Sequence, residues 1–271
     1  MKAPIPALLA LLLLTSPMAA GPGADQRLPW CKGDRRASTR PPAAPPSLTS
    51  PGACQAKASS LQRTRPIPAP GYHHLGATTT TGWSGVLARL EVGDPGVRAG
   101  TFDFLATRVM AKAETPDGLA WLEAGWAETG WDGAGKQRIY TYDTNRDSWA
   151  FYSQYEVKPG DQFWILVQTE QDSPAPAWQA WLWWGDAWHL LTSQELPLTG
   201  RAQIEQYVEV HTENPFPVPR LQVDNVQLKD GPAGPLGYWD ERVATMPGTP
   251  TGGYCLDWIR LYYTWAANTC P

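Results

Sequence analysis

From residue 80 onward the chain consists of short runs in which apolar and polar residues alternate, separated by Gly, Pro, Asn and Asp. Alternation with a period of two is typical of antiparallel strands that bury one face. Fifteen Trp, 27 Pro and 25 Gly favour short aromatic strands and tight turns over a helical bundle. The sequence therefore predicts an all-β fold, an antiparallel β-sandwich of the jelly-roll or concanavalin-like kind. The expected strands are Gly82–Glu91, Gly100–Val109, Leu119–Ala127, Arg138–Tyr142, Ala150–Glu156, Gln162–Thr169, Trp178–Trp184, Ala202–Val210 and Leu221–Lys229.

The N-terminus carries the one long apolar run of the sequence. Lys2 precedes the run Leu8–Leu14, and small residues follow at 19–21. This order is typical of a secretory signal peptide, which we assign to residues 1–20. The run is too short to span a bilayer, although a retained anchor is the alternative. We expect a secreted, extracellular protein that has no membrane contact after signal cleavage.

Charge divides the rest of the chain into two parts. Residues 21–70 have a net charge of +6, and residues 71–271 have a net charge of −11. The basic part is rich in Pro and Ala, a composition that favours disorder. We expect a disordered spacer there, or a pro-segment attracted to the acidic domain at 71–271. An acidic domain without a basic stripe also argues against a nucleic-acid partner.

The four cysteines suit an oxidising compartment. Their clustering suggests the pairs Cys31 with Cys54 and Cys255 with Cys270, among three pairings that four cysteines allow. The aromatic tail between the last two could pair with a sheet edge or carry a short helix. No Cys or His has zinc-like spacing, and no phosphate loop or nucleophile elbow is present. We therefore expect no metal, no cofactor and a monomer.

Two of the predicted strands carry glutamates: Glu123 lies in the middle of the first, on the face of Trp121 and Gly125, and Glu205 and Glu209 share one face of the second. The alternative interpretation is that the polar face of these strands is the solvated outer surface of the sandwich and has no further role. The candidate catalytic residues are Glu123, Glu205 and Glu209. Aromatic residues of the same two strands, taken as candidate substrate-binding residues, are Trp121, Trp126 and Tyr207.

Six short motifs follow one another between residues 82 and 229. They are Gly82-Trp83-Ser84-Gly85-Val86-Leu87, Gly100-Thr101-Phe102, Leu122-Glu123-Ala124-Gly125, Tyr155-Glu156-Val157-Lys158-Pro159-Gly160-Asp161, Ile204-Glu205-Gln206-Tyr207-Val208-Glu209, and Val218-Pro219 with Asn225-Val226-Gln227-Leu228. This collinear set resembles the secreted glutamic peptidases called eqolisins and, more loosely, their neprosin-like relatives. The third motif is similar to the family strand that carries a catalytic Gln, and the fifth to its Ala-Glu-Trp-Ile-Val-Glu strand.

The resemblance implies catalytic roles for the glutamates. Glu205 matches the catalytic glutamate of eqolisins, and Glu123 stands where they have a glutamine, which is a departure. Neprosin-like enzymes are expected to use two glutamates, so Glu123 could pair with Glu205 or with Glu209. An alignment to the neprosin pattern favours Glu209, whereas we prefer Glu205. Alternation does not decide, because both side chains leave the same face.

Two carboxyl groups that face each other can hydrolyse a peptide bond without a covalent intermediate. Repulsion and desolvation raise one pKa, so that one group holds a proton while the other activates water. We therefore expect a secreted, acid-acting glutamic-type endopeptidase with a polypeptide substrate. A glutamate donates a hydrogen bond only when it is protonated. The glutamate at position 123 thus restricts the pH range of activity to acidic pH, or it marks a homologue that has lost the activity.

Tryptophans support an alternative function. Exposed rings on a concave sheet stack against sugars, which predicts a non-catalytic, lectin-like module that binds a glycan. Alternation requires that one face of the strand 178–184 be buried, so part of this set belongs to the core. The residues that crowd this predicted hairpin are Trp178, Trp181, Trp183, Trp184 and Trp188. A cell-surface structural protein with the same fold is the third possibility.

Overall fold

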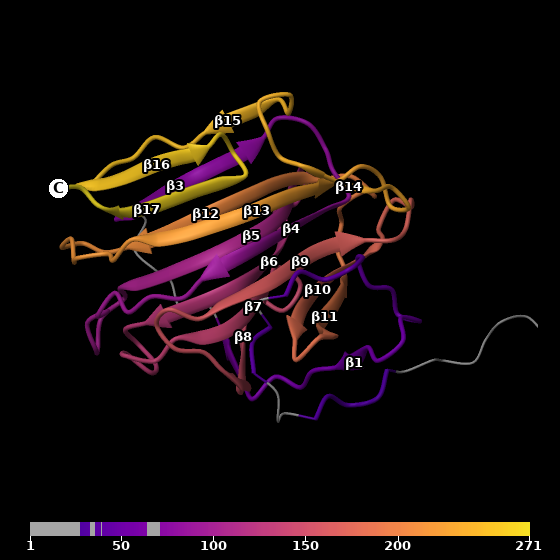
Figure 1. Cartoon of the computed structure of the whole chain (residues 1–271), viewed down its shortest axis with the longest axis horizontal. Coiled ribbons are helices and arrows are strands. Elements are labelled where there is room, and N and C mark those ends of the chain that lie inside the picture. The colour runs from indigo at the N-terminus through magenta and orange to yellow at the C-terminus, as the bar shows by residue number, and fades with distance from the viewer. Residues whose placement is uncertain (1–27, 33–35, 39, 64–70) are drawn as a thin grey trace, which may run out of the picture.

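The computed structural model describes residues 28–32, 36–38, 40–63 and 71–271, and its strands form two sheets packed face to face (Figure 1). Residues 1–20, predicted as the signal peptide, lie outside the described residues. None of the described residues belongs to a helix long and apolar enough to cross a membrane. The strands are β1 (Cys54–Gln55), β2 (Ser60–Arg63), β3 (Tyr72–Thr79), β4 (Gly85–Glu91), β5 (Phe104–Thr115), β6 (Gly118–Thr129), β7 (Arg138–Asp143), β8 (Ser148–Glu156), β9 (Gln162–Thr169), β10 (Ala177–Trp184), β11 (Ala187–Glu195), β12 (Gln203–His211), β13 (Leu221–Lys229), β14 (Leu236–Tyr238), β15 (Thr245–Pro247), β16 (Tyr254–Arg260) and β17 (Thr264–Thr269).

The two sheets differ in strand order. The nine-stranded sheet runs β1-β11-β10-β9-β4-β13-β17-β16, with β14 beside β13. The eight-stranded sheet runs β15-β3-β12-β5-β6-β7-β8-β2. Apart from the parallel pair β1 and β11, the paired strands are antiparallel. The predicted all-β antiparallel sandwich is thus confirmed.

The nine predicted strands correspond to β4 to β10, β12 and β13, with shifted ends. The largest shift is in β5, which begins at Phe104 rather than Gly100 and continues to Thr115. Gly100 has a φ of 74°, so it lies in a turn before the strand. β3 is not among the predicted strands, because its sequence Tyr-His-His-Leu-Gly-Ala-Thr-Thr lacks alternation. The aromatic tail forms the β16–β17 hairpin, which extends the sheet beyond β13.

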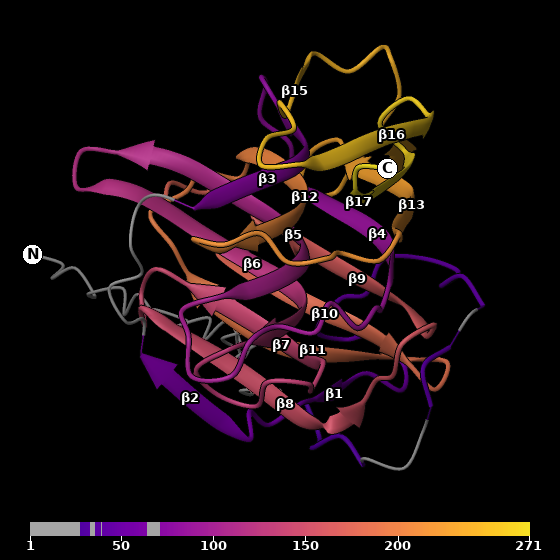
Figure 2. The same ribbon diagram turned by 90° about the vertical axis from the view of Figure 1, so that its left-hand side faces the viewer.

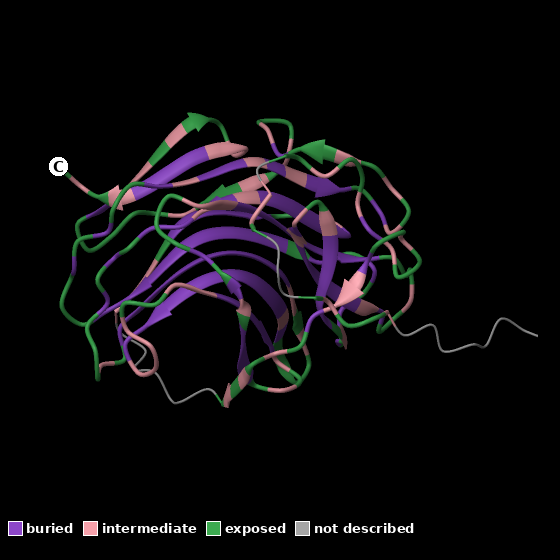
Figure 3. Cartoon of the chain, turned by 60° about the horizontal axis from the view of Figure 1, so that its bottom comes forward, coloured by how far each residue is buried: buried purple, intermediate pink, exposed green. Residues whose placement is uncertain are grey.

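Apolar side chains form clusters both between the sheets and on an outer face. The core between the sheets includes fully buried rings such as Trp126, Trp178 and Trp239. A separate aromatic cluster covers the outer face of the eight-stranded sheet, and it includes Phe104 and Trp149. Figure 3 shows the central strands curving as an arch that is buried along most of its length. The outer face of this sheet is therefore partly sheltered from solvent.

The described part of the basic segment lies along the sheet edges. β1 pairs with β11 in one sheet, and β2 pairs with β8 in the other (Figure 2). The indole nitrogens of Trp183 and Trp188 each donate a hydrogen bond of 3.0 Å to the segment, at the carbonyls of Arg40 and Ala44. The segment 28–63 therefore contacts both sheets through backbone groups.

Two disulfides join the cysteines as predicted. Cys31 is bonded to Cys54, and Cys255 to Cys270. Both cysteines of the first bridge lie in the N-terminal segment, whereas the second bridge links β16 to the residue after β17. Neither bridge connects the segment to the domain.

Replacing Cys255 and Cys270 together with Ser removes a cross-link between residues separated by 15 positions. The unfolded chain regains conformational entropy, so the free energy of unfolding should fall by roughly 3 kcal/mol. Thermal and urea unfolding of both proteins measure this change. An unchanged melting curve would show that the β16–β17 hairpin is stable without its bridge.

Candidate functional site

Cross-strand register brings the predicted carboxylates together on the eight-stranded sheet. In this sheet β5 lies between β6 and β12. Met110 of β5 is the register partner of both Glu123 on β6 and Glu205 on β12. Directly opposed residues point to the same face, so Glu123, Glu205 and, four residues along β12, Glu209 project from one side of the sheet. All three are buried.

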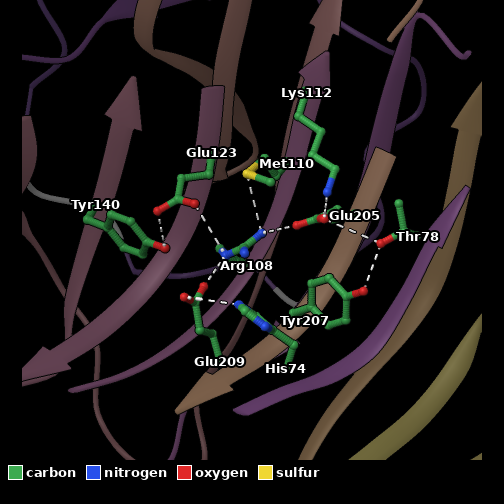
Figure 4. Close-up of polar contacts among 10 residues, drawn as sticks. All are labelled: His74, Thr78, Arg108, Met110, Lys112, Glu123, Tyr140, Glu205, Tyr207 and Glu209. Carbon is green, nitrogen blue, oxygen red and sulfur yellow. Dashed lines mark hydrogen bonds and ion pairs between the residues drawn. The ribbon is translucent and has the colours of Figure 1, made fainter. Parts of the chain in front are cut away.

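Arg108 is the centre of this cluster (Figure 4). Its Nη1 donates to Oε2 of Glu205 at 3.1 Å, and its Nε donates to Oε2 of Glu209 at 2.7 Å. The same Nε lies 3.3 Å from Oε2 of Glu123. The Arg108 side chain is only 4% exposed. The structure thus places the three predicted carboxylates around one buried guanidinium.

Each glutamate has a further partner. Oε1 of Glu205 accepts hydrogen bonds from Lys112 and, at 3.3 Å, from the Thr78 hydroxyl. Oε1 of Glu209 lies 3.3 Å from Nε2 of His74. Oε1 of Glu123 instead accepts a bond of 3.1 Å from a neutral donor, the hydroxyl of Tyr140 on β7.

These environments separate the glutamate pKa values. Burial is the main cause that raises the pKa of Glu123 to about 7; Glu209 and Glu205 raise it further, against the lowering effect of Arg108. Burial also acts to raise the pKa of Glu209, but Arg108 and His74 outweigh it and bring that pKa to about 2. Between these values Glu123 holds a proton while Glu209 is ionised.

The cluster opens into a cavity of about 370 Å³. Its charged lining residues include Arg108, Lys112 and the three glutamates. Its aromatic lining residues are Tyr72, Phe104, Trp121, Tyr142 and Trp149. The rings of Trp121 and Tyr142 are stacked, with centroids 5.2 Å apart. The cavity can therefore hold an apolar group beside groups that exchange protons.

The three predicted substrate-binding residues have different positions. Trp121 lines the cavity and is half-buried. Tyr207 packs under the cluster, with its ring centroid 5.6 Å from the Arg108 guanidinium and its hydroxyl 2.7 Å from Thr78. Trp126 lies in the core between the sheets and donates from its indole to the carbonyl of Glu91. It points away from the cavity, because it leaves the face of β6 opposite to Glu123.

The tryptophan-rich hairpin is not at the site. Three of its indoles, at Trp178, Trp181 and Trp184, are at most 2% exposed. The N-terminal segment covers the other two, as the hydrogen bonds to Arg40 and Ala44 show. The hairpin therefore offers no exposed aromatic platform for a sugar ring.

Several residues of the cluster were not predicted. Arg108 and Lys112 of β5 reach the predicted glutamates only because β5 lies between β6 and β12, and a single Arg within a strand gives no motif. Alternation on β5 does place Arg108 on the face of Met110, which was the available signal. His74 belongs to β3, which is not among the nine predicted strands. Among the described residues, the one close grouping of at least three potential metal ligands is Cys31, Cys54 and His189, and the disulfide occupies both sulfurs.

Comparison with solved structures identifies similar folds. The chain is similar to scytalido-glutamic peptidase with a peptide-based transition-state analogue, with a TM-score of 0.52, 13% identity, and coverage of 73% of this chain and 98% of that one. It is also similar to scytalido-glutamic peptidase with a transition-state analogue inhibitor, with a TM-score of 0.51, 12% identity and the same coverage. No protein-family profile and no curated protein matches the sequence. The chain thus has a glutamic peptidase-like fold, which the sequence resemblance implied.

The pKa of Glu123 predicts how stability depends on pH. Because the folded-state pKa is about 7 and the ordinary value is 4.5, the folded protein binds this proton more tightly than the unfolded chain does. The stability it contributes is complete at lower pH and is lost as pH rises toward 7, by about 3 kcal/mol at most. In Glu123→Gln this loss should disappear. Urea unfolding at pH 4.5 and pH 7 measures it, with the exposed Glu156→Gln as control; an equal loss in both variants would contradict the assignment.

Proposed function

We propose that this chain is an acid-acting endopeptidase of the glutamic type, with Glu123 as proton donor and Glu205 as general base. The observation that carries the proposal is the position of Glu123, whose pKa burial raises to about 7, beside two carboxylates that Arg108 contacts in the same cavity. Separated pKa values within one site are what acid–base catalysis requires. The glutamic-peptidase fold supports the same reaction class.

The geometry supports a single-displacement mechanism. Glu205 removes a proton from water, the resulting hydroxide attacks the carbonyl carbon, and Glu123 donates its proton to the carbonyl oxygen. When the tetrahedral intermediate collapses, the C–N bond breaks and the nitrogen takes the proton from Glu205. The new carboxyl group forms as Glu123 recovers its proton. Each carboxylate oxygen has two lone pairs, so Oε2 of Glu205 can accept a proton while it remains bonded to Arg108.

Glu209 is the second candidate base. It contacts the same nitrogen of Arg108 as Glu123 does, and it is ionised across the acid range. We prefer Glu205 because Met110 is the register partner of both Glu205 and Glu123, which places these two directly across the cavity floor. The eqolisin resemblance supports the same choice.

The substrate is proposed to be a polypeptide that lies over the eight-stranded sheet. The scytalido-glutamic peptidase structure contains a peptide-based transition-state analogue, which supports this class of substrate. The aromatic residues that line the cavity, including the half-buried Trp121, would accept an apolar side chain next to the scissile bond.

We further propose that the protein is secreted as a monomer after removal of residues 1–20. Two disulfides support an oxidising compartment. The domain proper would begin at residue 71, and residues 21–70 would form an N-terminal segment. The described part of this segment pairs with an edge strand of each sheet and does not line the cavity. A structural role at the sheet edges is therefore better supported than a pro-segment that blocks the site.

One observation favours a second candidate, a glycan-binding module. Trp121 is half-buried and stacked on Tyr142 at the cavity, an arrangement that also suits a sugar ring. Glycan-array binding without hydrolysis of any protein would support this function over the peptidase. Trp121→Ala would then abolish the binding.

Variants of the two glutamates test the peptidase. Glu205→Gln should abolish hydrolysis at every pH, because an amide cannot accept the proton of water. Glu123→Gln should stay active and lose the decline near pH 7, because an amide donates at every pH. Digestion of a denatured protein mixture from pH 3 to 8, followed by mass spectrometry, measures both.

Two further variants complete this experiment. Glu209→Gln identifies the base, since loss of activity there with retention in Glu205→Gln would exchange the two roles. Glu156→Gln, an exposed carboxylate of β8, is the matched control. Activity like that of the parent in all of these variants, or a parent that cleaves nothing, would overturn the proposal.

A further inference from the structure

Arg108 contacts the three glutamates with different geometry. It forms hydrogen bonds to Glu205 through Nη1 and to Glu209 through Nε. Its contact with Glu123, at 3.3 Å from the same Nε, is the longest of the three. The donors of the guanidinium are thus directed to the two carboxylates of β12, and Glu123 faces the charge without a comparable bond.

The second partners follow the same division. Glu205 has a second cation in Lys112, and Glu209 has a second donor in His74. Glu123 has the neutral hydroxyl of Tyr140. A carboxylate with charged donors on both oxygens is stabilised in its ionised form, whereas a buried carboxyl beside a phenol is not stabilised to the same extent.

The charges of the cluster balance when one proton is bound. Arg108 and Lys112 carry two permanent positive charges against three glutamates. The proton that balances the cluster can lie on a carboxyl group or on the imidazole of His74, which faces Glu209, so it is the hydrogen bonds of Arg108 that favour Glu123 as its site. The remaining groups around Arg108 are Tyr140 from β7, Tyr207 from β12, and, next to Glu209, Tyr72 and His74 from β3. The tyrosines are neutral in this pH range, since burial raises the pKa of Tyr72 to about 12 and raises those of the other two.

The backbone leaves room for this arrangement. Arg108 is paired in register with Tyr207 on β12 and with Gly125 on β6. A Cβ at Gly125 would lie 2.0 Å from the carbonyl oxygen of Thr107 and 2.9 Å from the Arg108 Cα, so that position requires glycine. The guanidinium can therefore lie between two levels along the strands, with Glu123 and Glu205 at one level and Glu209 at the other.

We propose that Arg108 is a positioning residue that distributes one proton among the three glutamates. Its two hydrogen bonds hold Glu205 and Glu209 as carboxylates, and the proton is left on Glu123. Arg108 would therefore set the lowest pH at which a general base is available. This inference deepens the proposed function and rests on it for its catalytic consequence, but the distribution of the proton can be measured without any substrate.

Two substitutions of Arg108 test the proposal. Arg108→Met removes the charge at similar length, and Arg108→Lys keeps a charge that has no planar fork to bind two carboxylates at once. In both we expect the pKa of Glu209 to rise, because the charge and the hydrogen bond of Arg108 lower it in the parent, and the acid-side limit of activity to move to higher pH. Activity at pH 3 should fall about tenfold, and more in the Met variant. If the Met variant does not fold, the Lys variant alone decides the outcome.

The direct measurement is a pH titration of the glutamate carboxyl carbons by NMR in ¹³C-labelled protein, assigned with the Glu→Gln variants. The control is Arg89→Lys, which alters the partly buried pair of Arg89 and Asp224 on the other sheet and should leave the cluster unchanged. If the carboxyl titrations shift in the Arg108 variants but the parent protein cleaves no substrate, the peptidase function is rejected and the role of Arg108 is retained. Parent-like titrations in both Arg108 variants would overturn the role of Arg108, whatever the activity.

Discussion

The buried charge of Arg108 is the constraint on which the rest of the site depends. A guanidinium removed from water costs several kcal/mol unless carboxylates surround it, and removing its partners one at a time leaves uncompensated charge. Here the partners come from two strands that flank its own, so their register must be correct to within one residue. A slip by one position would send the glutamates into the apolar core, which strongly disfavours other pairings. The same ion cluster that performs the proposed chemistry therefore also specifies how β5, β6 and β12 align.

Local patterns were sufficient to predict much of the fold. Alternation within each strand located nine strands and showed that Glu123 shares a face with Trp121 and not with Trp126, because the period of two belongs to the strand itself. The order β12-β5-β6 is a contact between distant segments, so the position of Arg108 between the glutamates could not be derived in the same way. His74 could not be assigned either, because its strand lacks alternation and its role depends on pairing with β12.

The tryptophans illustrate a second limit of sequence patterns. Alternation required that one face of β10 be buried, but it gave no sign of what covers the other. The N-terminal segment lies there, where the carbonyl groups of Arg40 and Ala44 accept hydrogen bonds from Trp183 and Trp188. These partners are more than 140 positions apart in the chain. The ring that does border the cavity, Trp121, stands alone in the sequence and is joined by Tyr142 and Trp149 only through strand pairing. Crowding in the sequence was thus a poor guide to an aromatic surface.

The bridge between Cys31 and Cys54 has a consequence for how the chain would behave after proteolysis. Both sulfurs belong to the N-terminal segment, so a cut anywhere between residues 63 and 71 would leave two fragments with no covalent link. Noncovalent contacts, among them strand pairing with β8 and β11 and the two indole hydrogen bonds, would then hold them together. Such a nicked protein would dissociate according to its concentration, and a reducing agent would not be needed to release the smaller fragment.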